Sequence, residues 1–332
     1  MIKDEFELIQ LIQKTLGKTS SNVLLGIGDD AAVTKPPKGK MVTTVDTLVE
    51  GVHFDLAYTT ARELGHKALA VSLSDLAAMG AKPLYALVSL GLTQNVNEYF
   101  VTEFYRGMKE LARKFKVDII GGNLVQSPTG MLIDVTAIGE APKTFVTRSG
   151  AKIGNLVAVT GSLGESAAGL NCLRRLGRVR MQGQEKIIDA HLMPQPRVHE
   201  ALSMQKTGAL TAMIDISDGL AREVHHLANR SAVGFEIDVS ALSISEQTRH
   251  GASLTNSDPL AWALYGGEDY ELLFTFKKEK LKAIKAAFKG KLTVIGRVVA
   301  KKNGVQLITG DGKSELQPKG WNHFVRRLPA QA

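Results

Sequence analysis

Residues 41–49 read Met41-Val42-Thr43-Thr44-Val45-Asp46-Thr47-Leu48-Val49, a run rich in β-branched side chains that predicts a β-strand. The segment from Thr60 to Met79 then has a helical pattern, with Leu64, Ala68 and Val71 on one apolar face. A strand followed by an amphipathic helix is typical of α/β proteins. This pair of elements decides the fold class, and the rest of the chain extends it in both directions.

The surrounding segments predict a two-domain protein of α/β (α+β) type. We expect a first domain over residues 1–140 and a second domain over residues 150–332, joined by a connection at 139–150. The first domain is predicted to contain helices at 6–16 and 98–115 and strands at 24–28, 31–33, 84–92, 117–120 and 131–138. The second is predicted to contain strands at 155–160 and 212–216, each leading through a turn into a helix. Residues 176–196 carry turn residues and few strand signals, so we expect a surface excursion there.

Composition excludes several classes of protein. The chain has 332 residues, of which 44% are hydrophobic and 22% charged, values ordinary for a globular protein and wrong for a disordered or fibrous one. The 41 Lys and Arg residues outnumber the 33 Asp and Glu residues, which gives a net charge of +8. The basic run at 277–280 has no interleaved aromatic residue, so we expect a solvated face and no nucleic-acid partner.

The compartment follows from cysteine usage and from the first residues. Cys172 is the single cysteine, which permits no intramolecular disulfide, and its helical context predicts a buried thiol. The first residues are acidic where a signal peptide is basic, and no run approaches the roughly 20 apolar residues of a membrane span. We therefore expect a cytoplasmic protein with no membrane partner.

Carboxylates at strand ends and turns are the recurring chemical theme. There is no phosphate-binding Gly-x-x-x-x-Gly-Lys-Ser/Thr loop, and Gly26-Ile27-Gly28 leads into an acidic pair instead of a helix. No Cys or His stands at zinc-ligand spacing beside these carboxylates, which favours Mg²⁺ held by oxygen atoms. Each aspartate alone could instead cap a helix or form a turn. The recurring residues are Asp29, Asp30, Asp46, Asp75, Asp215 and Asp218.

Other polar positions leave two interpretations open. Asp75 falls in the apolar stripe of its predicted helix, where a carboxylate must be paired, protonated, hydrogen-bonded or bound to a metal. Ser217-Asp218-Gly219 is either an N-cap or a ligand-binding turn. Gly266-Gly267-Glu268 is either a tight turn or a close approach of backbone to ligand. His53 and Arg148, taken singly, fit a structural or surface role as well as a binding one.

Several of these motifs together resemble a known family. The chain is similar to the bacterial thiamine-monophosphate kinases of the aminoimidazole-ribonucleotide-synthetase-like superfamily, and the matching blocks run in the family's order from near the start to the last ten residues. The blocks are Gly26-Ile27-Gly28-Asp29-Asp30-Ala31-Ala32, residues 45–54, residues 67–80, Thr147-Arg148-Ser149-Gly150-Ala151, residues 214–220, residues 266–272 and Lys319-Gly320-Trp321-Asn322-His323-Phe324.

The resemblance implies a fold and a reaction. It implies an N-terminal mixed-sheet domain that pairs with a second subunit to form a barrel in a homodimer, and a C-terminal α/β domain that completes the site. The implied reaction is transfer of the ATP γ-phosphoryl group to thiamine monophosphate with the help of several Mg²⁺ ions. No residue is expected to act as a covalent nucleophile or general base.

The resemblance also implies residue roles. The metal ligands would be Asp30, Thr44, the Val45 carbonyl, Asp46, Asp75, Asn123, Asp215 and Asp218. ATP would contact Gly122, Asn123, Arg148 and Ser217, and the thiamine side would contact His53, Glu268 and Trp321. Asn123 departs from the pattern, because the family usually has Asp there, so we expect one metal site to be weaker.

The chemistry of the residues agrees with such a transfer. A phosphate monoester is already largely dianionic at pH 7, so the acceptor oxygen needs no base, and the sequence accordingly contains no Ser-His-Asp or Cys-His arrangement. One alternative is another ATP-dependent synthetase of the same superfamily, although the reactive cysteine expected of two such enzymes is missing. A second alternative is a nucleic-acid-binding or metabolite-sensing module without catalysis, which the dispersed charge disfavours.

Overall fold

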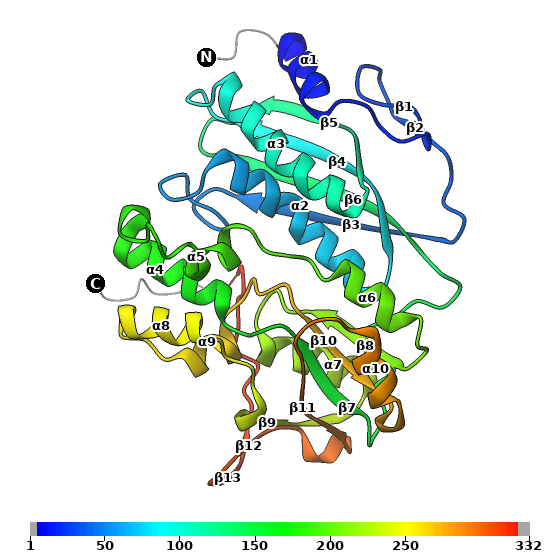
Figure 1. Ribbon diagram of the computed structural model, residues 1–332, viewed down its shortest axis with the longest axis vertical. Coiled ribbons are helices and arrows are strands. Elements are labelled where there is room, and N and C mark those ends of the chain that lie inside the picture. Colours follow the sequence, from blue (N-terminus) through cyan, green and yellow to red (C-terminus); the bar gives the residue numbers. More distant parts are fainter. Residues whose placement is uncertain (1–4, 325–332) are drawn as a thin grey trace. The chain divides into compact units, whose positions relative to one another are not determined.

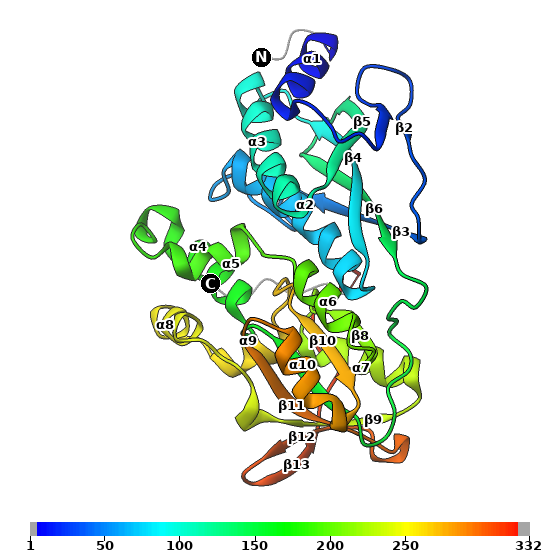
Figure 2. The same cartoon turned by 45° about the vertical axis from the view of Figure 1, so that its right-hand side comes forward.

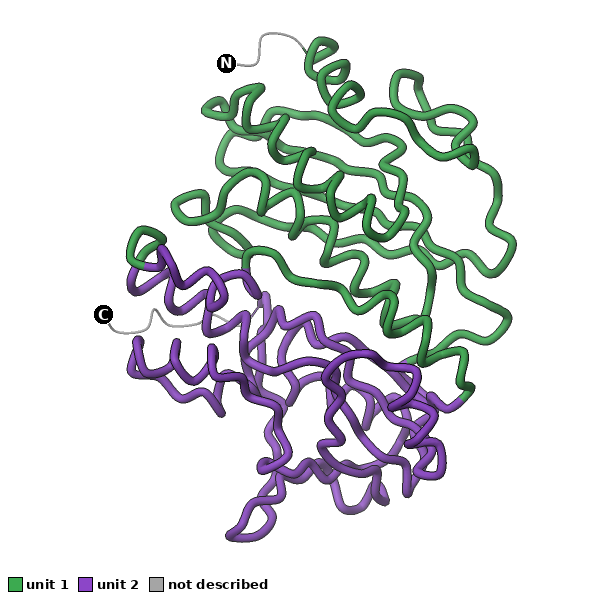
Figure 3. The backbone as a smooth tube through the Cα atoms, in the orientation of Figure 1, with its two compact units in different colours: residues 1–147, 177–180, 192–208 green, residues 148–176, 181–191, 209–332 purple. Residues whose placement is uncertain are grey.

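The computed structural model describes residues 5–324 and divides the chain into two compact units (Figure 3). Unit 1 contains residues 1–147, 177–180 and 192–208, and unit 2 contains residues 148–176, 181–191 and 209–332. The chain therefore passes between the units several times. Each unit has its own sheet and is described by itself.

Unit 1 is built on a four-stranded mixed sheet. Its strand order is β3 (Lys40–Val49), β6 (Leu132–Ala141), β4 (Lys82–Leu92) and β5 (Asp118–Gln126). The pairs β3–β6 and β6–β4 are antiparallel, whereas β4 and β5 are parallel. Helices α2 (Ala61–Ala78) and α3 (Glu98–Phe115) lie on the same face of this sheet (Figures 1 and 2).

Local sequence signals explain where these two helices begin and how closely they pack. Thr60 and Glu63 form a reciprocal capping box that starts α2, and Asn97 caps α3 by accepting a hydrogen bond from Phe100 N. The helices touch through glycines. A Cβ atom on Gly65 would lie 1.8 Å from Phe104 O, so any larger residue would push the helices apart.

The opposite face of the unit 1 sheet is open. Met41 is 65% exposed, Val45 57% and Val125 54%. These side chains alternate along β3 and β5 with residues that face α2 and α3, as the strand period of two requires. Unit 1 also contains α1 (Glu5–Leu16), β1 (Val23–Leu25), β2 (Val33–Thr34) and α6 (Val198–Gln205).

Unit 2 is built on a seven-stranded sheet. The strand order is β13 (Gly312–Glu315), β12 (Val305–Thr309), β9 (Gly234–Asp238), β11 (Leu292–Val299), β7 (Leu156–Thr160), β10 (Leu272–Phe276) and β8 (Leu210–Asp215). All neighbours are antiparallel except β9 and β12. The β12–β13 hairpin forms one edge (Figure 2).

Helices complete unit 2 around a buried apolar core. The core includes Val157, Ile214, Leu227, Phe235 and Leu273, which come from four strands and one helix. The helices and 3-10 turns are α4 (Glu165–Arg180), α5 (Glu185–Leu192), α7 (Leu220–Ser231), η1 (Val239–Ala241), α8 (Glu246–Thr255), α9 (Pro259–Tyr265), η2 (Lys278–Lys280), α10 (Leu281–Ala287) and η3 (Lys301–Asn303). The last residues of α4, 177–180, and the last residue of α5, Leu192, belong to unit 1.

The predicted mixed α/β architecture is confirmed, with corrections. Residues 176–196 contain no strand, as predicted, but the surface excursion expected there includes the end of α4 and all of α5. Positive φ angles at Gly177 and Gly183 interrupt the helical runs there, which hid their pattern. The predicted strands at 24–28 and 31–33 shrink to the short β1 and β2.

The single cysteine and the basic run have the exposure that the sequence predicted. Cys172 is completely buried, as expected from its helical context. The lysines at 277–280 are exposed, as expected of a solvated face. Within residues 5–324, no helix combines the length and the apolar character needed to cross a membrane.

Candidate active site

The first acidic group of unit 1 joins strand β3 to helix α2. The Thr44 hydroxyl donates a short hydrogen bond to Asp75 Oδ2, which gives this carboxylate in an apolar stripe a polar partner. Asp46 lies two residues along β3 on the same side of the strand as Thr44, facing α2. Pairing of β3 with β6 along its full length fixes the positions of both residues. We call Thr44, Asp46 and Asp75 the β3–α2 acidic group.

Electrostatics make this group suited to a cation. Burial and the neighbouring charge of Asp75 raise the pKa of Asp46 to about 6, and a hydrogen bond with Ser72 offsets only part of that rise. Asp46 Oδ2 is buried and has no hydrogen-bond partner within the described chain. A bound cation would satisfy this oxygen and remove the repulsion between the two carboxylates.

A cavity of about 410 Å³ lies beside the loop between β1 and β2. Asp29, Asp30, Gly122 and Asn123 line it, so the structure brings these sequence-predicted residues together within unit 1. A Cβ atom on Gly122 would lie 1.9 Å from Val88 O, so the pairing of β5 with β4 requires glycine here. Helix α1 also lines the cavity, a contribution that no sequence motif indicated.

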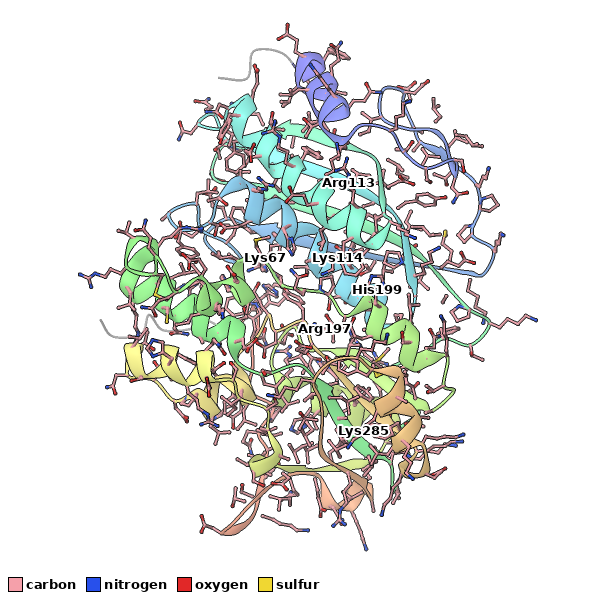
Figure 4. The ribbon with its side chains drawn as sticks, in the orientation of Figure 1. Lys67, Arg113, Lys114, Arg197, His199 and Lys285 are labelled. Carbon is pink, nitrogen blue, oxygen red and sulfur yellow. The ribbon has the colours of Figure 1, made fainter. Side chains whose placement is uncertain are left out.

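His53 lies in the ordered loop between β3 and α2. The Val49 backbone N–H donates to His53 Nδ1 at 3.0 Å, which places the proton of the neutral ring on Nε2. Lys67, a buried residue of α2 labelled in Figure 4, donates from Nζ to the His53 carbonyl at 3.0 Å. This contact ties the loop to the helix that carries Asp75.

In unit 2, three loop segments meet backbone to backbone. Glu268 N donates to Ser217 O at 2.7 Å, and Trp321 N donates to Asp218 O at 3.0 Å. Gly267 allows this approach, because a Cβ atom on it would lie 2.5 Å from Ser217 O. Glu268 itself has a φ of 65°, a left-handed conformation that is uncommon without glycine and costly to hold.

Arginine and histidine side chains surround the acidic residues of these loops. Burial raises the pKa of Asp218, while Arg222, His323, His226 and Arg148 act in the opposite direction. Arg222 Nε lies 3.2 Å from Asp218 Oδ2. Burial also raises the pKa of Glu223 to about 7, and Glu223 Oε1 accepts a hydrogen bond from Asp218 N at 3.2 Å.

The remaining predicted residues of unit 2 have defined surroundings. Asp215 is buried at the end of β8, opposite Leu272 of β10. Glu268 Oε2 lies 3.3 Å from Nδ1 of the buried His191. The Trp321 ring packs edge-on against the His323 ring, with centroids 5.5 Å apart.

The structure places the turn before α7 and reveals residues that the motifs did not indicate. Gly219, the last residue of Ser217-Asp218-Gly219, is the N-cap of α7, so this turn opens the helix as one interpretation predicted, although without a side-chain cap hydrogen bond. Arg222, Glu223 and His191 contact the predicted site residues, although no motif singled them out. For Arg222 the sequence offered one signal: its position four residues after Asp218, a spacing that favours an acid–base pair.

The predicted metal ligands of unit 1 are all oxygen donors. Within residues 5–324, no three His, Cys, Asp or Glu side chains converge on one metal position. The β3–α2 acidic group nevertheless offers two carboxylates and a hydroxyl, an all-oxygen donor set with an unsatisfied buried oxygen. These donors fit a hard cation such as Mg²⁺.

Comparisons with known proteins first define the class of the fold. The "AIR synthase related protein, N-terminal domain" family matches residues 28–141, and the corresponding C-terminal domain family matches residues 152–308. A solved "Thiamine-monophosphate kinase" from Stenotrophomonas maltophilia K279a superposes with a TM-score of 0.82 at 34% identity, covering 94% of this chain and 98% of that chain. A structure described as "AaThiL complexed with AMPPCP and TMP" gives a TM-score of 0.78 at 37% identity, over 98% of this chain and 99% of that chain.

Full-length similarity then narrows the class to one family. A "Thiamine-monophosphate kinase" of Bacillus subtilis (strain 168) is 40% identical over 334 residues, covering 97% of this chain and 99% of its own length. The protein of that name from Aquifex aeolicus (strain VF5) is 39% identical over 320 residues, covering 96% and 98%. The chain belongs to the thiamine-monophosphate kinase family.

Proposed function

We propose that this protein is an enzyme that transfers the γ-phosphoryl group of ATP to thiamine monophosphate and forms thiamine diphosphate and ADP. The observation that carries this proposal is the similarity, over 98% of the chain, to a structure described as complexed with AMPPCP and TMP. AMPPCP is an ATP analogue, so that relative binds a nucleotide of the required kind. The acidic and basic side chains described above supply matching chemistry.

The mechanism we propose is direct in-line transfer. A phosphate oxygen of thiamine monophosphate attacks the γ-phosphorus, the bond from that phosphorus to the β,γ-bridging oxygen breaks, and its electron pair leaves with ADP. The acceptor is already a dianion near pH 7, so no protein base is required. The obstacle is repulsion between two anions, and positioning with charge neutralisation addresses it.

The β3–α2 acidic group would hold Mg²⁺, aided by the Val45 carbonyl. When bound, Mg²⁺ would supply positive charge that lowers the repulsion between the phosphate groups. Asp30 and Asn123 would add oxygen ligands beside the cavity, and Asp215 and Asp218 would do so in unit 2. In this scheme the carboxylates hold cations and do not transfer protons.

Other residues would bind and orient the two substrates. Gly122 and Asn123 would contact ATP from the cavity in unit 1, and Arg148 and Ser217 would contact it in unit 2. A guanidinium such as that of Arg148 suits phosphate oxygens because its N–H groups form a planar fork. His53, Glu268 and Trp321 would contact the thiamine side, where a ring face and a carboxylate favour the cationic thiazolium.

We further propose that the protein is a cytoplasmic homodimer. The open face of the unit 1 sheet, which exposes Met41, Val45 and Val125, is the surface that a second copy would cover to close a barrel. Residues 1–140 would then supply dimerisation and nucleotide binding, and residues 150–332 would complete the site. Met41→Lys with Val125→Lys should give monomers in analytical ultracentrifugation, whereas a dimer unaffected by both changes contradicts this surface.

The decisive experiment is product analysis. Purified protein is incubated with ATP, Mg²⁺ and thiamine monophosphate, and the products are separated by chromatography beside a reaction with thiamine alone. Thiamine diphosphate formed from the monophosphate supports the function, and no product at any Mg²⁺ concentration overturns it. A phosphorylated protein trapped after mixing with γ-labelled ATP would contradict direct transfer while leaving the overall reaction intact.

A further inference from the structure

Trp321 lies on a segment without regular secondary structure. Leu316 is buried, but residues 316–322 form neither helix nor strand. The orientation of such a segment depends on the individual contacts that hold it. Two hydrogen bonds at Trp321 tether this segment to helix α7 and to the turn before that helix. A third contact to α7 lies five residues earlier in the segment, where His225 Nε2 is 2.7 Å from Leu316 O.

Both nearby tethers converge on Asp218 and Arg222. The Trp321 backbone N–H donates to Asp218 O, and Arg222 Nη1 donates to Trp321 O. The same guanidinium pairs through Nε with Asp218 Oδ2 at 3.2 Å. Arg222 therefore uses two donors of its planar fork to join a carboxylate and a carbonyl that lie about a hundred residues apart in the chain.

The geometry of the turn makes this bridge specific. Arg222 lies in the first turn of α7, four residues after Asp218, so both side chains lie on one side of the helix start. Gly320 fits against the turn, since a Cβ atom there would lie 2.4 Å from Asp218 O. A lysine would offer one ammonium group in place of a fork and could not reproduce both contacts in the same geometry.

We infer that Arg222 is a positioning residue that sets the orientation of Trp321 for thiamine monophosphate and couples it to Asp218. This inference rests on the proposed function, in which Trp321 contacts the thiamine side. Arg222 itself is not expected to touch the reacting atoms. Its removal should therefore weaken binding of thiamine monophosphate selectively.

The kinetic test compares Arg222→Met, Arg222→Lys and His225→Leu with the wild type. We expect Arg222→Met to raise KM for thiamine monophosphate about tenfold, the effect of losing one hydrogen bond from a charged donor. KM for ATP should change less than about threefold, Arg222→Lys should restore part of the loss, and His225→Leu should behave like the wild type. An unchanged KM for thiamine monophosphate, or equal rises in both KM values, overturns the inference.

A second measurement is independent of catalysis. In a Trp262→Phe background Trp321 is the only tryptophan, and its quenching by acrylamide reports how well it is held. Arg222→Met should increase quenching, and His225→Leu should not. Equal quenching in the two variants contradicts positioning by Arg222. If the wild type forms no thiamine diphosphate, the proposed function fails, and this result still decides the role of Arg222.

Discussion

The two acidic regions of this protein balance their charges differently. In unit 1, Asp46 and Asp75 come from a strand and a helix, and Asp46 keeps a buried oxygen that has no hydrogen-bond partner among residues 5–324. In unit 2, Asp218 lies on a loop and pairs with Arg222, and Arg148 and two histidines also act against the rise in its pKa that burial causes. The charge of Asp218 is therefore already partly offset by Arg222, whereas Asp46 and Asp75 repel each other until a cation binds.

The two regions also differ in how the backbone positions them. Regular pairing of β3 with β6 orients the unit 1 carboxylates. The unit 2 loops meet through close backbone contacts at Gly267 and Gly320 and through a left-handed residue, Glu268. In unit 1 we therefore expect the largest effects from substitutions that change charge. In unit 2 we expect effects from substitutions that disturb the close backbone contacts.

The largest effect is expected at Asp75. Asp75→Asn keeps an acceptor for Thr44 but removes the charge that would hold Mg²⁺, so kcat/KM should fall about 100-fold or more. The measurement is the rate of thiamine diphosphate formation. Asp134→Asn is the matched control, because Asp134 carries the same group on the neighbouring strand and bonds to Thr47 at 2.8 Å. We expect a loss of less than about threefold there, and similar losses in both variants would contradict the assignment.

A stability measurement without metal tests the charge imbalance at Asp46. The folded protein holds the pKa of Asp46 at about 6, above its unfolded value of 3.8, so stability falls as the pH rises from about 4 to about 6 and stays at that lower level above it. Asp46→Asn should raise the free energy of unfolding in EDTA at pH 8 by roughly 2–3 kcal/mol. The gain should fade as the pH falls through this window and vanish well below the unfolded pKa, where the aspartate is protonated in both states. Thermal unfolding at both pH values measures it, and a loss of stability at pH 8 contradicts the argument.

The close backbone contact in unit 2 predicts a smaller effect. Gly267→Ala places a Cβ atom 2.5 Å from Ser217 O, so it should destabilise the protein by about 1–3 kcal/mol. Gly121→Ala in unit 1 is the control, because its Cβ atom would meet only the movable Leu87 side chain at 3.0 Å. Urea unfolding compares the two variants. Equal destabilisation would contradict the contrast between loop and sheet.

The smallest effect is expected at Asn123. Asn123→Asp adds a charge beside Asp29 and Asp30 in the unit 1 cavity and should lower the half-saturating Mg²⁺ concentration about two- to fivefold. Gln126→Glu adds the same charge to the same strand outside the cavity and should leave that concentration unchanged. An unchanged Mg²⁺ titration for Asn123→Asp would show that the amide already serves this position.

Most of the secondary structure was predictable because it depends on local patterns. The strand predicted at 41–49 is β3 at 40–49, and the helix predicted at 98–115 has the observed bounds of α3. The helix α5 was missed because Gly177 and Gly183 break the surrounding run into pieces too short for a clear period. Local propensity also could not predict how short β1 and β2 are, because the length of each strand depends on its pairing with the other.

The sequence by itself determined the chemistry of the site: carboxylates without zinc-type partners, glycine-rich turns, and motif blocks that place the chain in one family. The tertiary structure alone decided which of these groups meet. It brought Thr44 to Asp75, left one buried oxygen of Asp46 without a hydrogen-bond partner in the described part of the chain, and joined Asp218 to Trp321 through Arg222. The reason is physical, because pKa values and charge pairing depend on burial and on distances between residues far apart in the chain, which residue spacing does not contain.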